Sequence, residues 1–263
     1  MNKSALRSLA GFTAICMGLT LACAVGVQAQ ENAKPSWTLI MVFKVRAEMR
    51  PEFESMQKEL SAAYKQAGAG SRTVWQDFLG DVNTYTVVTS IPSFAAFDGP
   101  MPLDKGLGKE RADALRKRLN STITDLRRMV VENKMDLSMV GDNNQPQPYV
   151  VVAEATALPN RDKEFESWIK QEYLPAMKQG GVKELYTMRV VFGGRGGDYV
   201  LVVPLPNLAV IDEGHPAWKM QGGRTAAEKM FAHGHDLAHF GEETIARYLP
   251  EASYVAAPMT AAK

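Results

Sequence analysis

The sequence repeats itself across its two halves. The segment PEFES at 51–55 returns as KEFES at 163–167, 112 residues later. Further matches follow at a displacement of 114 residues, and they pair Tyr85, Pro92, Phe94 and Asp98 with Tyr199, Pro206, Leu208 and Asp212. A period above 100 residues indicates two similar domains rather than a solenoid. We therefore expect ferredoxin-like repeats at 35–142 and 149–257, a linker at 143–148 and a disordered tail at 258–263.

The first 29 residues have the pattern of a secretory signal peptide. Lys3 and Arg7 precede an apolar run, and Val27 and Ala29 provide the small residues before a cleavage site. We therefore expect an exported protein, periplasmic or secreted. The alternatives are an uncleaved helical anchor, or lipidation at Cys23 that would hold the protein at the membrane.

Removal of this segment would change both the charge and the cysteine content. It takes two basic residues from 30, which leaves 28 basic against 29 acidic residues. This balance offers no attraction to nucleic acid or to an anionic membrane surface. Both cysteines, Cys16 and Cys23, lie in the removed segment, so a thiolate mechanism is excluded.

The order of predicted elements is the same in both halves: strand, helix, strand, strand, helix, strand. In the first half we expect these at 37–46, 49–66, 72–79, 83–91, 109–132 and 135–140. In the second half we expect them at 149–156, 162–178, 184–192, 198–205, 225–248 and 252–256. This order is the ferredoxin-like arrangement, in which both helices cover one face of an antiparallel sheet.

The predicted strands are apolar on both faces, as Thr38–Phe43 shows, so each sheet needs cover on its second face. Two halves packed sheet to sheet would form an intramolecular α/β barrel. Together with the EFES helix entry, this order resembles the dimeric α/β-barrel superfamily, which includes NIPSNAP-like proteins, antibiotic-biosynthesis-type monooxygenases, EthD-like proteins and chlorite-dismutase-like haem enzymes. The resemblance implies a ligand between the sheets, and we also expect pairing into a homodimer.

Alternation along the strands predicts which residues face that cavity. Ile40, Val42 and Lys44 would point inward from the first strand. The same register in the second half turns Glu154 inward, where apolar neighbours would desolvate its carboxylate and make it a proton acceptor. Arg189 could bind an anionic ligand in the same cavity. The structural alternative pairs Glu154 with Arg189 or Lys44.

All four histidines lie in the second half. His215 and Trp218 occupy a loop that could close over a ligand, with His215 as a general acid or base. The alternative is an ordinary loop with the indole packed on the barrel. His235 and His239 are four residues apart in a predicted helix, so they share a face and could bind haem or a divalent metal. A solvated helix face is the other interpretation.

No phosphate loop, dinucleotide fingerprint or hydrolase motif is present in the sequence. The leading hypothesis is therefore an exported small-molecule-binding barrel. The resemblance adds cofactor-independent oxygenase or isomerase chemistry on an apolar or aromatic compound, with Glu154 and His215 as catalytic residues and Arg189, Lys44 and Trp218 as ligand-binding residues. One alternative is a non-catalytic envelope or stress protein with a self-filled cavity. Another is a haem or metal enzyme, and the residues alone leave open whether any reaction occurs.

Overall fold

The computed structural model describes residues 36–141 and 145–256. The predicted signal peptide with Cys23, and the predicted tail at 258–263, lie outside these ranges and stay predictions. Within the described ranges, no helix combines the length and the apolar character needed to cross a membrane.

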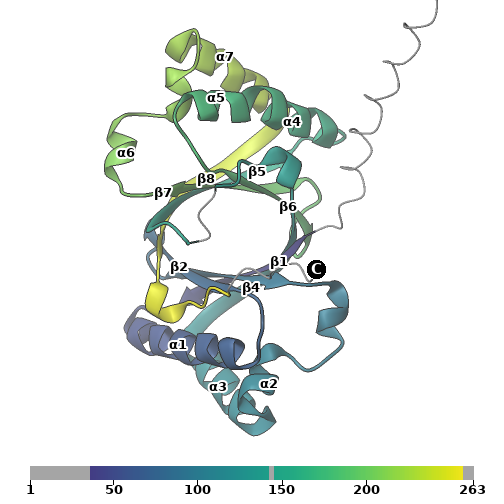
Figure 1. Ribbon diagram of the computed structural model, residues 1–263, viewed down its shortest axis with the longest axis vertical. Coiled ribbons are helices and arrows are strands. Elements are labelled where there is room, and N and C mark those ends of the chain that lie inside the picture. The colour runs from purple at the N-terminus through teal and green to yellow at the C-terminus, as the bar shows by residue number, and fades with distance from the viewer. Residues whose placement is uncertain (1–35, 142–144, 257–263) are drawn as a thin grey trace, which may run out of the picture. The chain divides into compact units, whose positions relative to one another are not determined.

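Eight antiparallel strands of the described chain form one closed barrel (Figure 1). The strands are β1 (Trp37–Val45), β2 (Arg72–Leu79), β3 (Thr84–Ile91), β4 (Ile123–Asn133), β5 (Tyr149–Ala157), β6 (Tyr186–Phe192), β7 (Asp198–Leu205) and β8 (Ala238–Tyr248). Each half has the same strand order, β4-β1-β3-β2 and β8-β5-β7-β6. The predicted fold, two ferredoxin-like halves that form an intramolecular α/β barrel, is confirmed.

The two half-barrels join through their edge strands. β2 pairs with β8 and β4 pairs with β6, so every strand has a partner on each side. Closure satisfies the backbone N–H and C=O groups that an open sheet edge would expose. It also holds the two inner faces apart as the walls of a barrel.

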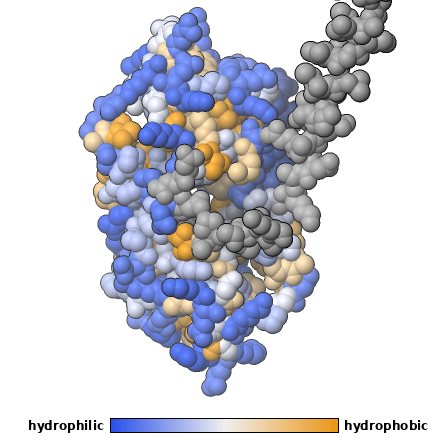
Figure 2. All heavy atoms as spheres, in the orientation of Figure 1, coloured by the Kyte–Doolittle hydropathy of each residue, from blue (hydrophilic) through white to orange (hydrophobic). Residues whose placement is uncertain are grey.

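The helices of each half cover the outer face of its own sheet (Figure 1). The first half contributes α1 (Arg50–Gln66), α2 (Pro102–Leu107) and α3 (Lys109–Thr122). The second half contributes α4 (Asp162–Trp168), a π-helical turn (Ile169–Tyr173), α5 (Leu174–Gln179), α6 (Ala209–Asp212) and α7 (Gly223–His235). In Figure 2 the outer helical layers are mainly hydrophilic, and hydrophobic residues show mostly between them, beside the barrel.

The repeated sequence residues make the same contacts in both halves. They are Phe53, Glu54 and Tyr85 in the first half and Phe165, Glu166 and Tyr199 in the second. Each phenylalanine is fully buried, and its ring centroid lies 4.8 Å from that of the tyrosine in the first half and 5.2 Å in the second. Each tyrosine hydroxyl donates a hydrogen bond to the glutamate, at 2.6 Å and 3.0 Å respectively. These residues therefore hold the first helix of each half against its third strand.

The last helix of each half is shorter than predicted. The prediction placed helices at 109–132 and 225–248, but α3 ends at Thr122 and α7 at His235. The remainder of each segment forms β4 or β8. Three consecutive β-branched residues, Thr122, Ile123 and Thr124, disfavour a helix and favour a strand. Hydrogen-bonded pairing of β4 with β1 and β6 then stabilises this segment as a strand.

The predicted closing strands at 135–140 and 252–256 are wrong. Each segment is a short 3-10 helix followed by a single bridge to the opposite half. Met139 bridges to Leu185, and Tyr254 bridges to Arg72. Because β4 and β8 already complete the sheets, these segments instead cross over and tie the two halves together.

Candidate functional site

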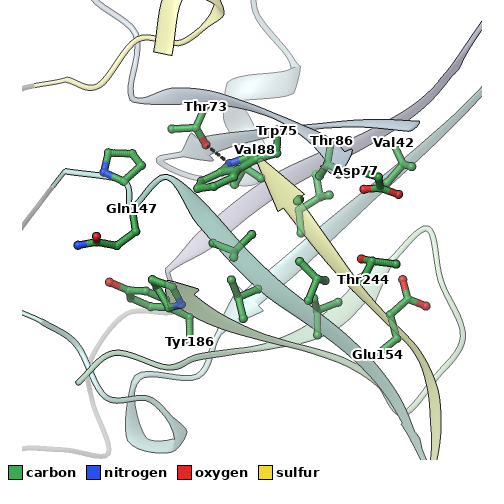
Figure 3. Close-up of a pocket in the computed structure, with 18 of the residues that line it drawn as sticks. Val42, Thr73, Trp75, Asp77, Thr86, Val88, Gln147, Glu154, Tyr186 and Thr244 are labelled. Atoms are coloured by element: carbon green, nitrogen blue, oxygen red, sulfur yellow. Dashed lines mark hydrogen bonds between the residues drawn. The ribbon is translucent and has the colours of Figure 1, made fainter. Parts of the chain in front are cut away.

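The interior of the barrel contains a cavity of about 600 Å³ (Figure 3). Its central wall is apolar and comes from both halves, with Ile40, Val42, Val88, Met129, Val150, Val152, Val200, Val202 and Ala246. An eight-stranded barrel is just wide enough either to be filled by side chains or to hold one small ligand. Here the inward residues are mainly valines and threonines, while the large aromatic residues of the cores pack under the helices. The described side chains therefore leave the interior hollow, which disagrees with a self-filled cavity.

Strand alternation places the inward residues as predicted. Ile40, Val42 and Lys44 of β1 line the cavity, whereas Phe43 and Val45 pack under the helices of the first half. On β5, the inward set includes Val150, Val152 and Glu154. The predicted phase of both strands is therefore confirmed.

Carboxylates gather at one end of the cavity. Asp77 on β2 and Glu154 on β5 lie there with Thr244 of β8 (Figure 3), and β8 runs between β2 and β5. Glu242 of β8 also belongs to the lining. Neighbouring strands are about 4.8 Å apart, so β2 and β5 run roughly 10 Å apart on the two sides of β8. Asp77 stands across β8 from Val150, and Glu154 lies four residues further along β5.

Asp77 is the most perturbed acid of this group. Burial raises its pKa to about 6, Lys44 opposes this increase, and Asp81 adds to it. Among the described residues, none donates a hydrogen bond to the Asp77 carboxylate. An acid with this pKa is mostly ionised at neutral pH and still accepts a proton readily.

Lys44 lines the same end but is held by other groups. Its Nζ donates to Asp81 Oδ2 at 2.9 Å and to Thr84 Oγ1 at 2.7 Å. Glu154 faces the cavity as predicted, but its side chain is exposed to solvent rather than enclosed by apolar neighbours. The ligand-binding role of Lys44 and the catalytic role of Glu154 stay predictions.

The opposite end of the cavity is aromatic. Trp75 of β2 and Tyr186 of β6 lie there on facing walls (Figure 3). The indole N–H of Trp75 donates to Thr73 Oγ1 at 3.0 Å, and the Tyr186 hydroxyl donates to Glu184 Oε2 at 3.1 Å. Burial raises the pKa of Tyr186 to about 12, so its hydroxyl stays protonated. Linker residues 145–147 complete this end.

Arg189 does not face the cavity, so its predicted role there is wrong. It pairs in register with Tyr199 of β7, whose side chain points to the helical layer. Its guanidinium donates to Glu132 Oε2 at 2.8 Å on that outer side. Adjacent residues on a strand point to opposite faces, and the inward positions on β6 belong to Tyr186 and Met188.

His215 and Trp218 also lie away from the cavity. They belong to the helical layer of the second half, where His215 caps a short 3-10 helix and its Nδ1 accepts the N–H of Ala217 at 3.1 Å. The ring of His215 packs against Phe231 at 5.0 Å, and burial lowers the pKa of this histidine. Trp218 packs against the Arg224 guanidinium at 4.7 Å. The predicted catalytic and ligand-binding roles of these two residues are wrong because neither reaches the cavity.

His235 and His239 do not share a helix face. His235 is the last residue of α7, whereas His239 belongs to β8. Within the described ranges, no group of three or more His, Cys, Asp or Glu side chains could hold a metal ion. The helical geometry on which the metal hypothesis rested is therefore wrong.

Haem, which the resemblance also implied, does not fit the residues of the cavity. No histidine is among the described residues that line it, so the usual axial ligand is missing. Haem carries anionic propionates, whereas the charged residues of the described lining are mostly carboxylates. The space under the helices of the second half is filled by a buried core that includes Phe165, Trp168 and Met230.

Asp77, Trp75 and Tyr186 were missed by the sequence analysis. The signal was available, because the alternation applied to 37–46 also divides 72–79 into two faces. Thr73, Trp75 and Asp77 share the inward face, and Val74 and Gln76 share the other.

The chain was compared with known proteins. No protein-family model matches it, and no curated protein matches its sequence. Solved structures match its fold. An anthrone oxidase-like protein is 13% identical over 87% of this chain and 97% of that chain, with a TM-score of 0.57. A candidate monooxygenase from Lactobacillus acidophilus NCFM is 9% identical over 84% and 96% of the two chains, with a TM-score of 0.54.

A candidate chlorite dismutase matches similarly, at 12% identity over 83% of this chain and 96% of that chain, with a TM-score of 0.53. At these identities the comparison establishes the fold alone. The resemblance to monooxygenase-like and chlorite-dismutase-like barrels is confirmed at that level. The NIPSNAP likeness and the homodimer stay predictions.

Proposed function

We propose that the protein binds a small, largely apolar or aromatic molecule inside the barrel, and that Asp77 accepts a proton from it. One observation carries this proposal: a cavity of about 600 Å³ with apolar walls contains a carboxylate to which no described residue donates a hydrogen bond. The predicted signal peptide adds that the protein acts after export.

The chemistry follows from the position of Asp77. Burial raises its pKa to about 6, so at neutral pH the carboxylate is the main form and is a stronger base than an ordinary aspartate. It would take the proton of an acidic C–H bond and leave the electron pair on the bound molecule. Return of the proton to a different carbon completes an isomerisation.

With dioxygen as the oxidant, the same carbanion leads to oxygenation. Carbon forms a bond to oxygen, and loss of water from the resulting hydroperoxide converts a CH₂ group and O₂ into C=O and H₂O. This route needs no cofactor, because the bound molecule supplies the electrons. Among solved structures with this fold, monooxygenase-like and anthrone oxidase-like proteins support it as the finer form of the proposal.

The alternative is binding without reaction. The exposed Glu154 and the neutralised Lys44 would then only orient a ligand, as the solvent-accessible acidic end allows.

Native mass spectrometry of the protein purified from its host tests the binding step. We expect a co-purifying small molecule that is lost in Val152→Phe, because the larger side chain fills the middle of the cavity. Val82→Phe is the matched control, since Val82 lies outside the lining and is 43% exposed. A bound molecule that survives Val152→Phe, in protein shown by circular dichroism to be folded, would place it outside the barrel.

Oxygen consumption with anthrone tests the proton-transfer step. We expect turnover that falls by roughly 100-fold in Asp77→Asn, because general-base catalysis contributes about that factor. Asp98→Asn is the matched control on an exposed loop outside the lining. Equal rates in Asp77→Asn and in the unmodified protein would remove Asp77 from the reaction. A bound molecule without any anthrone turnover would favour the binding-only alternative.

A further inference from the structure

The charge of the cavity lining is strongly one-sided. Among the described residues, four carboxylates and a single ammonium group face it. The carboxylates are those of Asp77, Glu154, Glu184 and Glu242, and the ammonium group is that of Lys44. The whole protein is close to neutral, with 30 basic and 29 acidic residues. The excess of acids is therefore a property of the cavity rather than of the chain.

Internal partners account for only part of this charge. Lys44 is paired with Asp81, whose Oδ2 lies 2.9 Å from Nζ. Glu184 accepts the Tyr186 hydroxyl at the aromatic end. Asp77, Glu154 and Glu242 share the other end, and no described residue donates a hydrogen bond to any of them.

Asp77 is half-buried beside the apolar wall, whereas Glu154 and Glu242 are exposed to solvent. A charged group that has lost part of its hydration is stabilised by an opposite charge. Low-dielectric walls also focus the field of the carboxylates into the cavity, which raises the local concentration of cations. Burial likewise raises the pKa of Asp77, and Lys44 only partly opposes this increase.

The geometry favours an organic cation over a metal ion. The acids lie on β2, β5 and β8, and the described residues contain no set of three that could hold a metal. An ammonium group has several N–H donors and can be attached to a large body, so it can contact acids on different strands. On β2, Trp75 of the aromatic end and Asp77 of the acidic end are two residues apart, so their backbones are about 7 Å apart along the strand.

We propose that the cavity selects an amine: a molecule with an aromatic or alkyl body that packs between the valines and Trp75, and with a protonated nitrogen at Asp77 and Glu154. This inference rests on the proposed binding in the barrel and names the class of its ligand. It is independent of whether a reaction follows.

Three probes with the same aromatic body test it: 2-(2-naphthyl)ethylamine, 2-(2-naphthyl)ethanol and 2-naphthylacetate. Their affinities are measured by isothermal titration calorimetry at pH 7.5 with the protein purified from its host. We expect the amine to bind at least roughly tenfold more tightly than the alcohol, because hydrogen bonds between charged groups are about twice as strong as neutral ones. The carboxylate should bind most weakly, and added salt should reduce the preference for the amine.

Variants locate the source of the preference. In Asp77→Asn/Glu154→Gln, the affinity for the amine should fall to the affinity for the alcohol. The affinity for the alcohol should not change. Asp98→Asn/Glu110→Gln removes the same two charges from exposed positions outside the lining and should keep the preference. Thermal melts followed by circular dichroism verify that both double variants are folded.

The outcomes separate this inference from the proposed function. Equal binding of amine and alcohol, or a preference that survives Asp77→Asn/Glu154→Gln, would overturn the amine inference and leave barrel binding in place. Binding of none of the three probes would overturn both. Binding of all three that persists in Val152→Phe would show a site outside the barrel and would also overturn both.

Discussion

The two halves of the molecule agree where helix meets sheet and differ where strands face the cavity. At the helix–sheet contact, the phenylalanine, tyrosine and glutamate of the repeat recur with nearly the same distances. Inside the barrel, Asp77 on β2 corresponds to Val190 on β6, and Glu154 on β5 corresponds to Val42 on β1. The shared residues therefore build the fold, and the residues that differ give the cavity its chemistry.

A second difference lies where the segments after β4 and β8, at 135–139 and 250–254, cross to the opposite half. The bridge from Tyr254 meets Arg72, whereas the matching bridge from Met139 meets Leu185. Arg72 is only 2% exposed, and it donates to Gln57 and to Ser61 Oγ, the latter at 2.8 Å. Burial lowers the pKa of this arginine to about 10, which still leaves it charged at neutral pH.

At the equivalent place, the second half packs apolar side chains instead of a polar network. Leu185 is fully buried in a core with Trp168 and Ile169, and Leu137 of the crossing segment joins it. In the first half, Ser61 instead donates a hydrogen bond to the backbone oxygen of Ala252 at 2.6 Å. One topology thus accepts either a polar network or an apolar core at equivalent places. Within the described residues, Gln57 Nε2 of the polar network is buried without a hydrogen-bond partner.

The largest expected effect tests the part on which the halves agree. Phe53→Ala and Phe165→Ala should each lower the free energy of unfolding by about 4 kcal/mol, because both rings are fully buried against a tyrosine. Urea unfolding of the two variants provides the comparison. A loss more than twice as large in one half would show that the repeated contacts are not equivalent in energy.

A somewhat smaller loss is expected where the halves differ. Arg72→Ala should cost about 3 kcal/mol, since it removes a buried side chain and leaves Gln57 and Ser61 without their donor. Gln57→Ile/Arg72→Leu brings in the residue types of the second half and should recover part of that loss, as measured by the same urea titration. If the double variant is less stable than Arg72→Ala, the two packing solutions are not interchangeable.

The fold was predictable because its signals are local. The alternation of Trp37–Val45 identifies the inward face correctly, since a strand turns successive side chains to opposite sides whatever surrounds it. The segment 109–132 was predicted as one helix because its apolar residues recur at helical spacing. Its second part becomes β4 through pairing with β1 and β6, which lie far away in the sequence.

The site was only partly predictable, because local signals do not show which side chains of distant strands meet in the cavity. Glu154 is conspicuous as a carboxylate within an apolar strand, and it does face the cavity. Asp77 precedes a turn at Gly80 and Asp81, so in the sequence it looks like an ordinary solvated residue. Arg189 was assigned to the wrong face because a shift of one residue in strand register reverses every side chain.

The smallest expected effect concerns the acid that distinguishes the first half inside the barrel. Asp77→Asn should increase the free energy of unfolding by about 1 to 2 kcal/mol at pH 8, because it removes a poorly solvated charge. Burial raises the folded-state pKa to about 6 from an ordinary value of 3.8, so the folded protein holds the proton more tightly. Stability should therefore fall as the pH rises from about 4 to 6 and then stay low.

Urea unfolding at pH 4.5 and pH 8 measures this directly, with Asp98→Asn as the control on an exposed loop. The gain from Asp77→Asn should be large at pH 8 and should shrink at pH 4.5, where the carboxyl is protonated in the folded protein and already uncharged. The groups acting on Asp77 are Lys44, which favours its ionised form, and Asp81, which disfavours it. A loss of stability at pH 8 would mean that other groups of the protein already stabilise the charge of the Asp77 carboxylate. A bound cation would then not be needed to balance that charge.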